Sequence, residues 1–116
     1  MAKQVLYLSY DGITDALGQS QILPYVLGLE KLGHSFHIVS FEKKETYFQF
    51  RANIEQQLQG TKITWHPFFY TKKPPVLSTL FDLYKMHAKA KELVKNYSIS
   101  LVHCRSYLPA IIGKSL

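Results

Sequence analysis

The run Val5-Leu6-Tyr7-Leu8-Ser9-Tyr10, closed at once by Asp11-Gly12, decides the fold class of this chain. A short apolar run that ends at a turn signal is typical of a strand buried on both faces. A second run of this kind follows at Phe36–Phe41, and a segment with helical periodicity separates the two. Buried strands that alternate with helices predict an α/β fold with a parallel sheet and right-handed crossovers.

The rest of the chain continues this alternation. Ser20 is expected to cap the first helix, and Gly33 to stop it. Pro67 is expected at the end of a strand, because proline cannot donate to a ladder. The expected elements are a helix from about 20 to 32, a helix at 46–58, a strand at 62–67, a long helix at 78–96, a strand at 100–104 and a last helix that begins near 108.

The segment 78–96 carries the strongest helical pattern in the chain. Its side chains divide into an apolar arc toward the core and a charged arc toward solvent. The apolar arc is predicted to hold Leu80, Leu83, Met86, His87, Ala90, Leu93, Val94 and Tyr97. The charged arc is predicted to hold Asp82, Lys85, Lys89, Glu92 and Lys95.

The strand order expected for such a chain is the Rossmann-like order 3-2-1-4. Its topological switch point lies between the first and fourth strands, and ligands of such sheets bind outside the carboxyl ends of the strands at that point. The prediction therefore sets the loop Asp11–Gln19 opposite the turn Arg105-Ser106-Tyr107.

Composition narrows the class of protein. The chain has 116 residues, of which 47% are hydrophobic, so a disordered chain is excluded. The lone Cys104 excludes a disulfide framework and a multi-cysteine zinc site. The chain lacks an apolar run of about 20 residues and a signal-peptide layout. A soluble protein of a reducing compartment, the cytoplasm, is expected.

The loop after the first strand is the main candidate for function. It is longer than the usual ~2–6 residues, and Gly18 before Gln19-Ser20 would let a backbone approach a phosphate closely. The loop is neither a dinucleotide fingerprint nor a Walker loop. Asp11 and Asp15 suit hydroxyl recognition or loop capping better than a metal. A packed surface loop whose glycines only need positive φ is the alternative.

Arg105 directly follows the fourth strand. A fixed cation there can bind a phosphate or a carboxylate, and a surface pair with an aspartate of the first loop is the alternative. The preceding His103 and Cys104 are neighbours in a strand and point to opposite faces, so they cannot form a nucleophile pair. Cys104 is interpreted as a core residue.

Charge is distributed unevenly along the chain. Residues 1–42 hold two basic and four acidic residues, whereas residues 43–116 hold 12 and four. Lysines beside exposed aromatic residues indicate an anionic membrane surface or a nucleic acid, and a plain solvated helix is the alternative. The membrane-surface candidates are Lys72, Lys73, Phe81, Tyr84, Lys85 and Lys89.

Several of these segments together resemble the N-terminal domain of family-4-like glycosyltransferases, which are retaining GT-B enzymes. The segments are Ser9-Tyr10-Asp11-Gly12, Thr14-Asp15, Leu17-Gly18-Gln19-Ser20-Gln21, Leu23-Pro24-Tyr25, Gly28-Leu29, Gly33-His34, Ser40-Phe41-Glu42-Lys43 and Leu101-Val102-His103-Cys104-Arg105-Ser106. Many family members have a glycine pair where this chain has Gly18-Gln19, and His-x-His where it has His103-Cys104-Arg105. Residues 45–97 match in layout only.

The resemblance implies a sugar transfer from a nucleotide-sugar donor to a glycan or lipid-linked acceptor. It implies no bound metal and no tightly bound cofactor. Acceptor contacts would come from Asp11, Thr14, Asp15, Arg105 and Ser106. Contacts to the donor phosphates or sugar would come from Gly18, Gln19 and Ser20. The sequence assigns no catalytic residue.

The resemblance also implies that the chain is a truncated first domain. The donor-binding second domain with its Glu-x7-Glu motif has no counterpart, so the fragment alone is expected to be inactive. The fourth strand would then be an exposed edge, and we expect self-association through it. The alternative from another class is a small nucleotide- or nucleic-acid-binding Rossmann-like module that acts through its basic helix.

Overall fold

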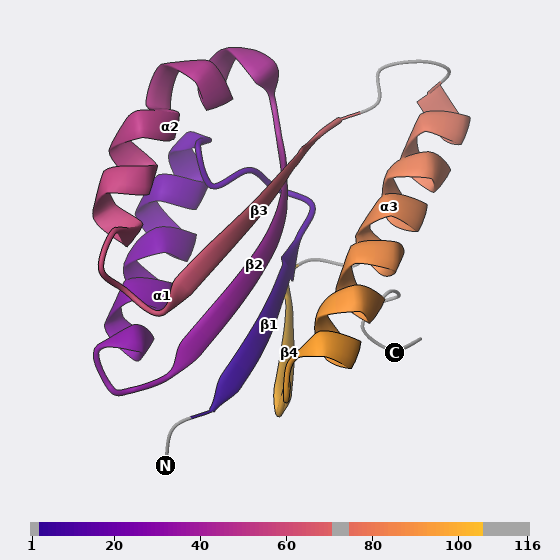
Figure 1. The fold of residues 1–116 in the computed structure, drawn as a ribbon. Helices are drawn as coiled ribbons and strands as arrows, with labels where there is room; N and C mark the ends of the chain where they lie inside the picture. The colour runs from indigo at the N-terminus through magenta and orange to yellow at the C-terminus, as the bar shows by residue number, and fades with distance from the viewer. Residues whose placement is uncertain (1–2, 71–74, 106–116) are drawn as a thin grey trace.

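Four parallel strands form one sheet in the order β3-β2-β1-β4, in a computed structural model that describes residues 3–70 and 75–105 (Figure 1). The strands are β1 (Gln4–Ser9), β2 (Ser35–Glu42), β3 (Ile63–Phe69) and β4 (Leu101–Arg105). The Rossmann-like α/β fold and the order 3-2-1-4 predicted from the sequence are confirmed. The last helix expected near 108 lies outside the described residues.

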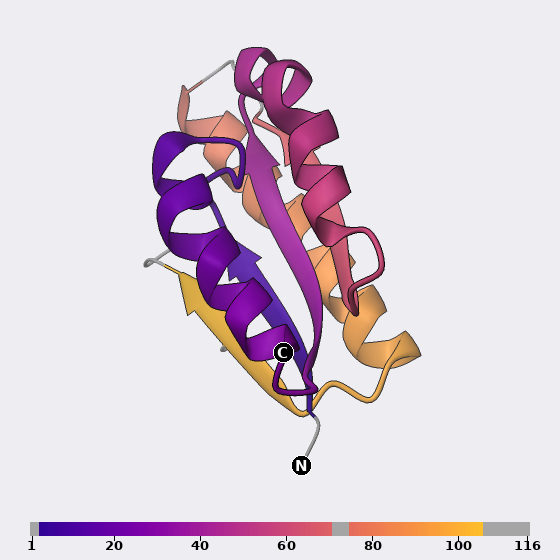
Figure 2. The ribbon, with the colours of Figure 1, turned by 90° about the vertical axis from the view of Figure 1, so that its left-hand side faces the viewer.

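Helices cover both faces of the sheet. The π-helical turn η1 (Gly18–Ile22) runs into α1 (Leu23–Glu30), which lies with α2 (Lys44–Leu58) on one face (Figure 2). The long helix α3 (Pro75–Asn96) lies on the other face (Figure 1). Gly33 and Gly60 follow α1 and α2 with φ of +100° and +77°, as expected for glycines that terminate helices.

The core consists of two apolar layers, one on each face of the sheet. The layer under α1 and α2 includes Val5, Tyr7, Ile13, Ile22, Leu23, Val26, Phe36, Ile38, Ile54, Leu58 and Ile63. The layer under α3 includes Leu6, Leu8, Val39, Phe41, Met86, Ala90 and Leu93. Residues adjacent in β1 and β2 alternate between the layers, as the period of a strand requires. No helix of the described residues is long and apolar enough to cross a bilayer.

Two expected boundaries were wrong. Ser20 does not cap the first helix, because helical structure already begins at Ala16 and the Ser20 hydroxyl donates to the Leu17 carbonyl oxygen, 3.3 Å away. The first helical hydrogen bond runs from the Gln19 N–H to the Asp15 oxygen. Pro67 does not end β3, which continues to Phe69. The sheet tolerates this proline because β3 is an edge strand among the described residues.

The predicted apolar arc of the long helix is confirmed at Met86, Ala90 and Leu93, and it is wrong in the first two turns. Asp82, expected in the solvent arc, is completely buried, whereas Leu80, expected in the core, is 57% exposed. The Tyr10 hydroxyl donates to Asp82 Oδ2 at 2.9 Å, and the Lys85 ammonium lies 3.4 Å from Oδ1. A buried carboxylate with these partners keeps its hydrogen bonds, so it can take a core position.

Two histidines meet on the α3 face of the sheet. His37 Nδ1 lies 3.2 Å from His66 Nε2, and the Tyr97 ring packs on His37 with centroids 4.2 Å apart. Burial, together with the positive charge of Lys89, lowers the pKa of both imidazoles, that of His66 to about 4. Both rings are therefore neutral at pH 7.

Because burial keeps the rings of His37 and His66 neutral, we expect the protein to lose stability in acid. The unfolded chain takes up a proton on His66 near pH 6.5, whereas the folded chain does so only near 4. The free energy of unfolding should therefore fall by about 2–3 kcal/mol as the pH decreases from 6.5 to 4. Urea unfolding at several pH values would measure it. His66→Gln should have a flatter profile than the parent, and an identical profile would contradict the prediction.

Candidate functional site

The carboxyl edge of the sheet brings together the two segments that the sequence set opposite each other. In the register of β1 and β4, Ser9 pairs with Arg105, so the loop after β1 starts beside the end of β4 (Figure 1). Arg105 Nε lies 3.7 Å from Asp11 Oδ2, and Arg105 Nη2 donates to Gln21 Oε1 at 2.7 Å. Arg105 thus forms the pair with an aspartate of the first loop that the sequence offered as the alternative to ligand binding. Binding of a phosphate or carboxylate by Arg105 stays a prediction.

The carboxylate of Glu42, at the end of β2, holds the loop in place. Its Oε2 accepts from the Ile13 N–H at 2.9 Å, and its Oε1 accepts from the Thr14 N–H at 3.1 Å and from the Thr14 hydroxyl at 2.6 Å. The Ser40 hydroxyl also donates to Oε2. Four donors therefore satisfy a side chain that is completely buried. The sequence alone assigned Glu42 no role. An acidic residue at the end of an apolar strand could have indicated a buried carboxylate with hydrogen-bond donors around it.

Positions 12 and 18 require glycine because neither has room for a Cβ atom. A Cβ on Gly12 would lie 2.5 Å from Glu42 Oε1, and one on Gly18 would lie 2.1 Å from the Gly12 carbonyl oxygen and 2.7 Å from Ile13 Cα. Neither glycine has a positive φ, so the interpretation that they serve only that conformation was wrong. The close approach at Gly18 is to the backbone of the same loop, and the approach to a phosphate stays a prediction.

A groove of about 540 Å³ lies between this loop and α2. Its lining consists of Thr14, Asp15, Ala16, Gln19, Ser20, Thr46 and Phe50. Gln19 Nε2 donates to the Thr14 carbonyl oxygen at 2.9 Å, which orders the floor of the groove. The π-helical turn η1 starts here, and such turns are frequent at functional sites.

The predicted site residues are divided between two places. Asp15, Gln19 and Ser20 line the groove, whereas Asp11 lies with Arg105 on the side toward β4. Thr14, expected to orient acceptor hydroxyls, is only 1% exposed, and its hydroxyl contacts Glu42 and Thr46. Ser106 lies outside the described residues.

Two tyrosines connect the loop to the opposite layer. The Tyr10 hydroxyl donates to Asp82 of α3, and the Tyr70 hydroxyl donates to the Tyr10 carbonyl oxygen. Burial and the hydrogen bond to Asp82 raise the pKa of Tyr10 to about 12, and burial also raises that of Tyr70. Both phenols therefore stay protonated at neutral pH, so they act as hydrogen-bond donors and not as bases.

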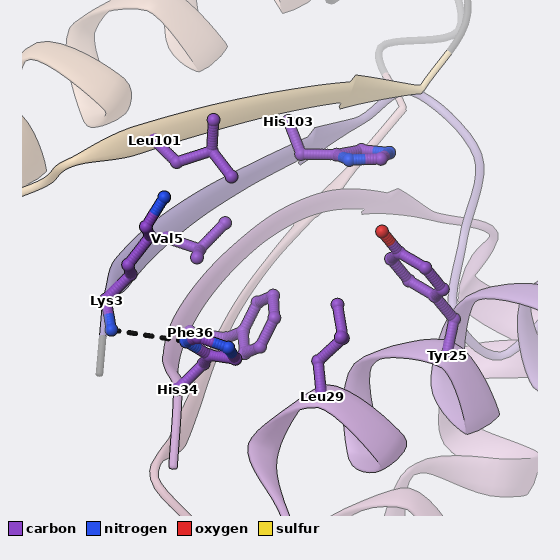
Figure 3. Close-up of a pocket in the computed structure, with 8 residues that line it drawn as sticks. All are labelled: Lys3, Val5, Tyr25, Leu29, His34, Phe36, Leu101 and His103. Atoms are coloured by element: carbon purple, nitrogen blue, oxygen red, sulfur yellow. Dashed lines mark hydrogen bonds between the residues drawn. The ribbon is translucent and has the colours of Figure 1, made fainter. Parts of the chain in front are cut away.

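A smaller pocket of about 210 Å³ lies at the amino edge of the sheet, between α1 and β4 (Figure 3). The His103 ring faces it from β4 and stacks on Tyr7 with centroids 4.6 Å apart. Cys104 packs against the layer under α3, which confirms both its core role and its separation from His103. The other lining residues are Lys3, Val5, Tyr25, Leu29, His34, Phe36 and Leu101.

The described residues show hydrogen-bonding groups at the carboxyl edge of the sheet and no candidate metal centre. In 3–70 and 75–105, no group of three or more histidine, cysteine or acidic side chains is placed to hold a metal ion. Comparison of the chain with protein-family models, with curated proteins and with solved structures gave no match. Fold and site therefore define a class, a small Rossmann-like α/β domain with a parallel sheet in the order 3-2-1-4.

Proposed function

We propose that this chain is the acceptor side of a GT-B glycosyltransferase that moves a sugar from a nucleotide-sugar donor to a glycan or lipid-linked acceptor. The observation that carries the proposal is the meeting of the loop after β1 with the end of β4 at the switch point, where Glu42 holds a loop of unusual length. This is the edge where parallel α/β sheets bind ligands. The resemblance of the loop to that family supports the same assignment.

Each proposed role follows from what a side chain can reach. The carboxylates of Asp11 and Asp15 accept hydrogen bonds from sugar hydroxyls, and Arg105 attracts an anionic group of the acceptor. Gln19 and Ser20, at the groove, make the contacts toward the donor. Gly18 and Thr14 act as positioning residues, because both are buried within the loop. The proposal uses no metal and no resident cofactor.

The proposal also concerns the rest of the enzyme and its location in the cell. In it, the domain described here holds the acceptor, and a second domain of the GT-B fold binds the donor. Its location is the cytoplasm, at the inner face of the membrane where the acceptor is lipid-linked. Leu101 is 47% exposed on β4, an edge strand among the described residues, and marks the surface proposed for self-association.

The test uses the product of the whole gene. Release of nucleoside diphosphate is measured with a panel of nucleotide sugars and a membrane and glycan extract as acceptor. Arg105→Ala combined with Asp11→Asn should lower kcat/KM for the acceptor by about 100-fold, because both polar contacts are lost. Arg51→Ala, on the exposed face of α2, is the matched control and should behave like the parent. No release with any donor, or full activity of the double variant, would refute the proposal.

A further inference from the structure

The outer face of α3 carries four large apolar side chains that no core layer covers. Leu77, Leu80, Phe81 and Tyr84 are 62%, 57%, 55% and 69% exposed. Their spacing of three, four and seven residues places them on one side of the helix. We call these four residues the α3 patch. A cluster of this kind marks an interaction site, unlike single exposed apolar residues.

The buried side of α3 explains why the patch faces outward. Asp82, Met86 and Ala90 are completely buried against the sheet, so the helix cannot rotate to bury Leu80. The hydrogen bond from Tyr10 to Asp82 fixes this rotation. The exposure of the patch is therefore a consequence of the packing of the whole domain.

Lysines lie on the same side of the helix, toward its C-terminal end. Lys91 and Lys95 are exposed and lie 14 residues after Leu77 and Phe81, close to four helical turns further along. Lys85 lies over the Phe81 ring, 5.2 Å from its centroid. Glu92, the exposed acidic residue of the described part of α3, is paired with Lys89 at 3.2 Å. The helix thus presents apolar side chains followed by lysines.

We propose that the α3 patch, with Lys91 and Lys95, docks this domain on an anionic lipid bilayer. The helix would lie along the surface with its apolar side chains in the headgroup region and its lysines on the anionic headgroups. The excess of basic residues in 43–116, 12 against four, has the sign that such a surface attracts. Lys72 and Lys73, which precede α3, lie outside the described residues.

The composition of the patch favours lipid over nucleic acid. Bases stack on aromatic rings, whereas leucines such as Leu77 and Leu80 offer them no stacking surface. Two of the lysines first considered for such a surface have intramolecular partners. Lys85 is paired with Asp82 and donates to the Phe69 carbonyl oxygen, and Lys89 is paired with Glu92.

Docking in this way would turn the α3 side of the carboxyl edge toward the membrane, whereas the groove lies beside α2 on the other face of the sheet. The first turns of α3 lie at the carboxyl edge of the sheet, where Asp82 binds Tyr10 at the start of the site loop (Figure 1). A lipid-linked acceptor would then reach the loop from the bilayer. This link to the acceptor rests on the proposed function, whereas the docking itself does not.

Vesicle sedimentation of the 116-residue chain tests the docking without any sugar transfer. Vesicles of equal parts phosphatidylglycerol and phosphatidylcholine should bind the chain, and vesicles of phosphatidylcholine alone should bind it at least tenfold more weakly. Leu80→Ser with Phe81→Ser should weaken binding to the anionic vesicles at least tenfold. Phe48→Ser, a change at an aromatic residue of α2 that is 64% exposed, is the control.

A second pair of variants tests the charges. Lys91→Glu with Lys95→Glu should also weaken binding at least tenfold, whereas Lys3→Glu with Lys31→Glu, which changes the net charge equally, should have a much smaller effect. Absence of binding to anionic vesicles, or equal losses in the two charge pairs, would overturn the proposal. So would tight oligonucleotide binding that depends on Lys91 and Lys95, or a dimer that Leu80→Ser with Phe81→Ser dissociates.

Discussion

Gly18→Ala is expected to lower the free energy of unfolding by about 4 kcal/mol or more. The added Cβ would lie 2.1 Å from the Gly12 carbonyl oxygen and 2.7 Å from Ile13 Cα. Both are backbone atoms, so no side chain can move aside. The loop itself has to shift, and the hydrogen bonds from Ile13 and Thr14 to Glu42 are then lost.

Gly28→Ala is the matched control for this result. Gly28 lies in α1, and a Cβ there meets nothing within 4 Å. Alanine should therefore stabilise the helix by about 0.5–1 kcal/mol. Urea unfolding of the two variants beside the parent measures the difference. Equal stability of the two variants would show that the loop is not packed as described.

Glu42→Ala should cost about 3–5 kcal/mol of stability. Removing the carboxylate leaves the N–H groups of Ile13 and Thr14 without an acceptor in a buried place. The hydroxyls of Thr14 and Ser40 lose the same partner. Because these bonds hold the loop, amide hydrogen exchange at residues 13 and 14 should accelerate more than exchange within β1.

Glu45→Ala serves as the control, since Glu45 is an exposed residue in the first turn of α2. Its loss should stay within about 1 kcal/mol, the usual size of a charge effect at a helix start. Glu42→Gln should fall between the two, because an amide offers one acceptor oxygen where the carboxylate offers two. A stability loss below about 1 kcal/mol in Glu42→Ala would contradict the conclusion that the Glu42 carboxylate holds the loop.

The candidate site was partly predictable from the sequence. Loop length and its position after the first strand identified 11–19, and the strand order set Arg105 opposite it. The role of Glu42 was not predictable in this way, since it acts on residues 28 and 29 positions earlier in the chain. Only the pairing of β1 with β2 brings its carboxylate to the loop.

The glycines illustrate a second limit. Gly33 was correctly predicted to end the first helix, because the conformation of a helix end is a local property, and Gly60 ends α2 in the same way. A Cβ on Gly12 would meet Glu42 and Phe41, and a Cβ on Gly18 would meet Gly12 and Ile13. These contacts depend on how the loop folds back. The sequence pattern indicated only that a glycine is needed at position 18. The structure shows which atoms lie close to it.

By itself, the sequence determined the α/β class, the order of the elements and the order of the strands, because alternating apolar runs and helical periods leave few topologies for a parallel sheet. Periodicity also placed Met86, Ala90 and Leu93 in the core, whereas the tertiary structure alone decided which side chains the first two turns of α3 bury. Periodicity ranks positions by apolar character, and it placed Leu80 inside and Asp82 outside. Asp82 is buried because Tyr10, 72 positions away, donates a hydrogen bond to it. A contact between distant segments is a property of the packed chain, and it left Leu80 on the surface.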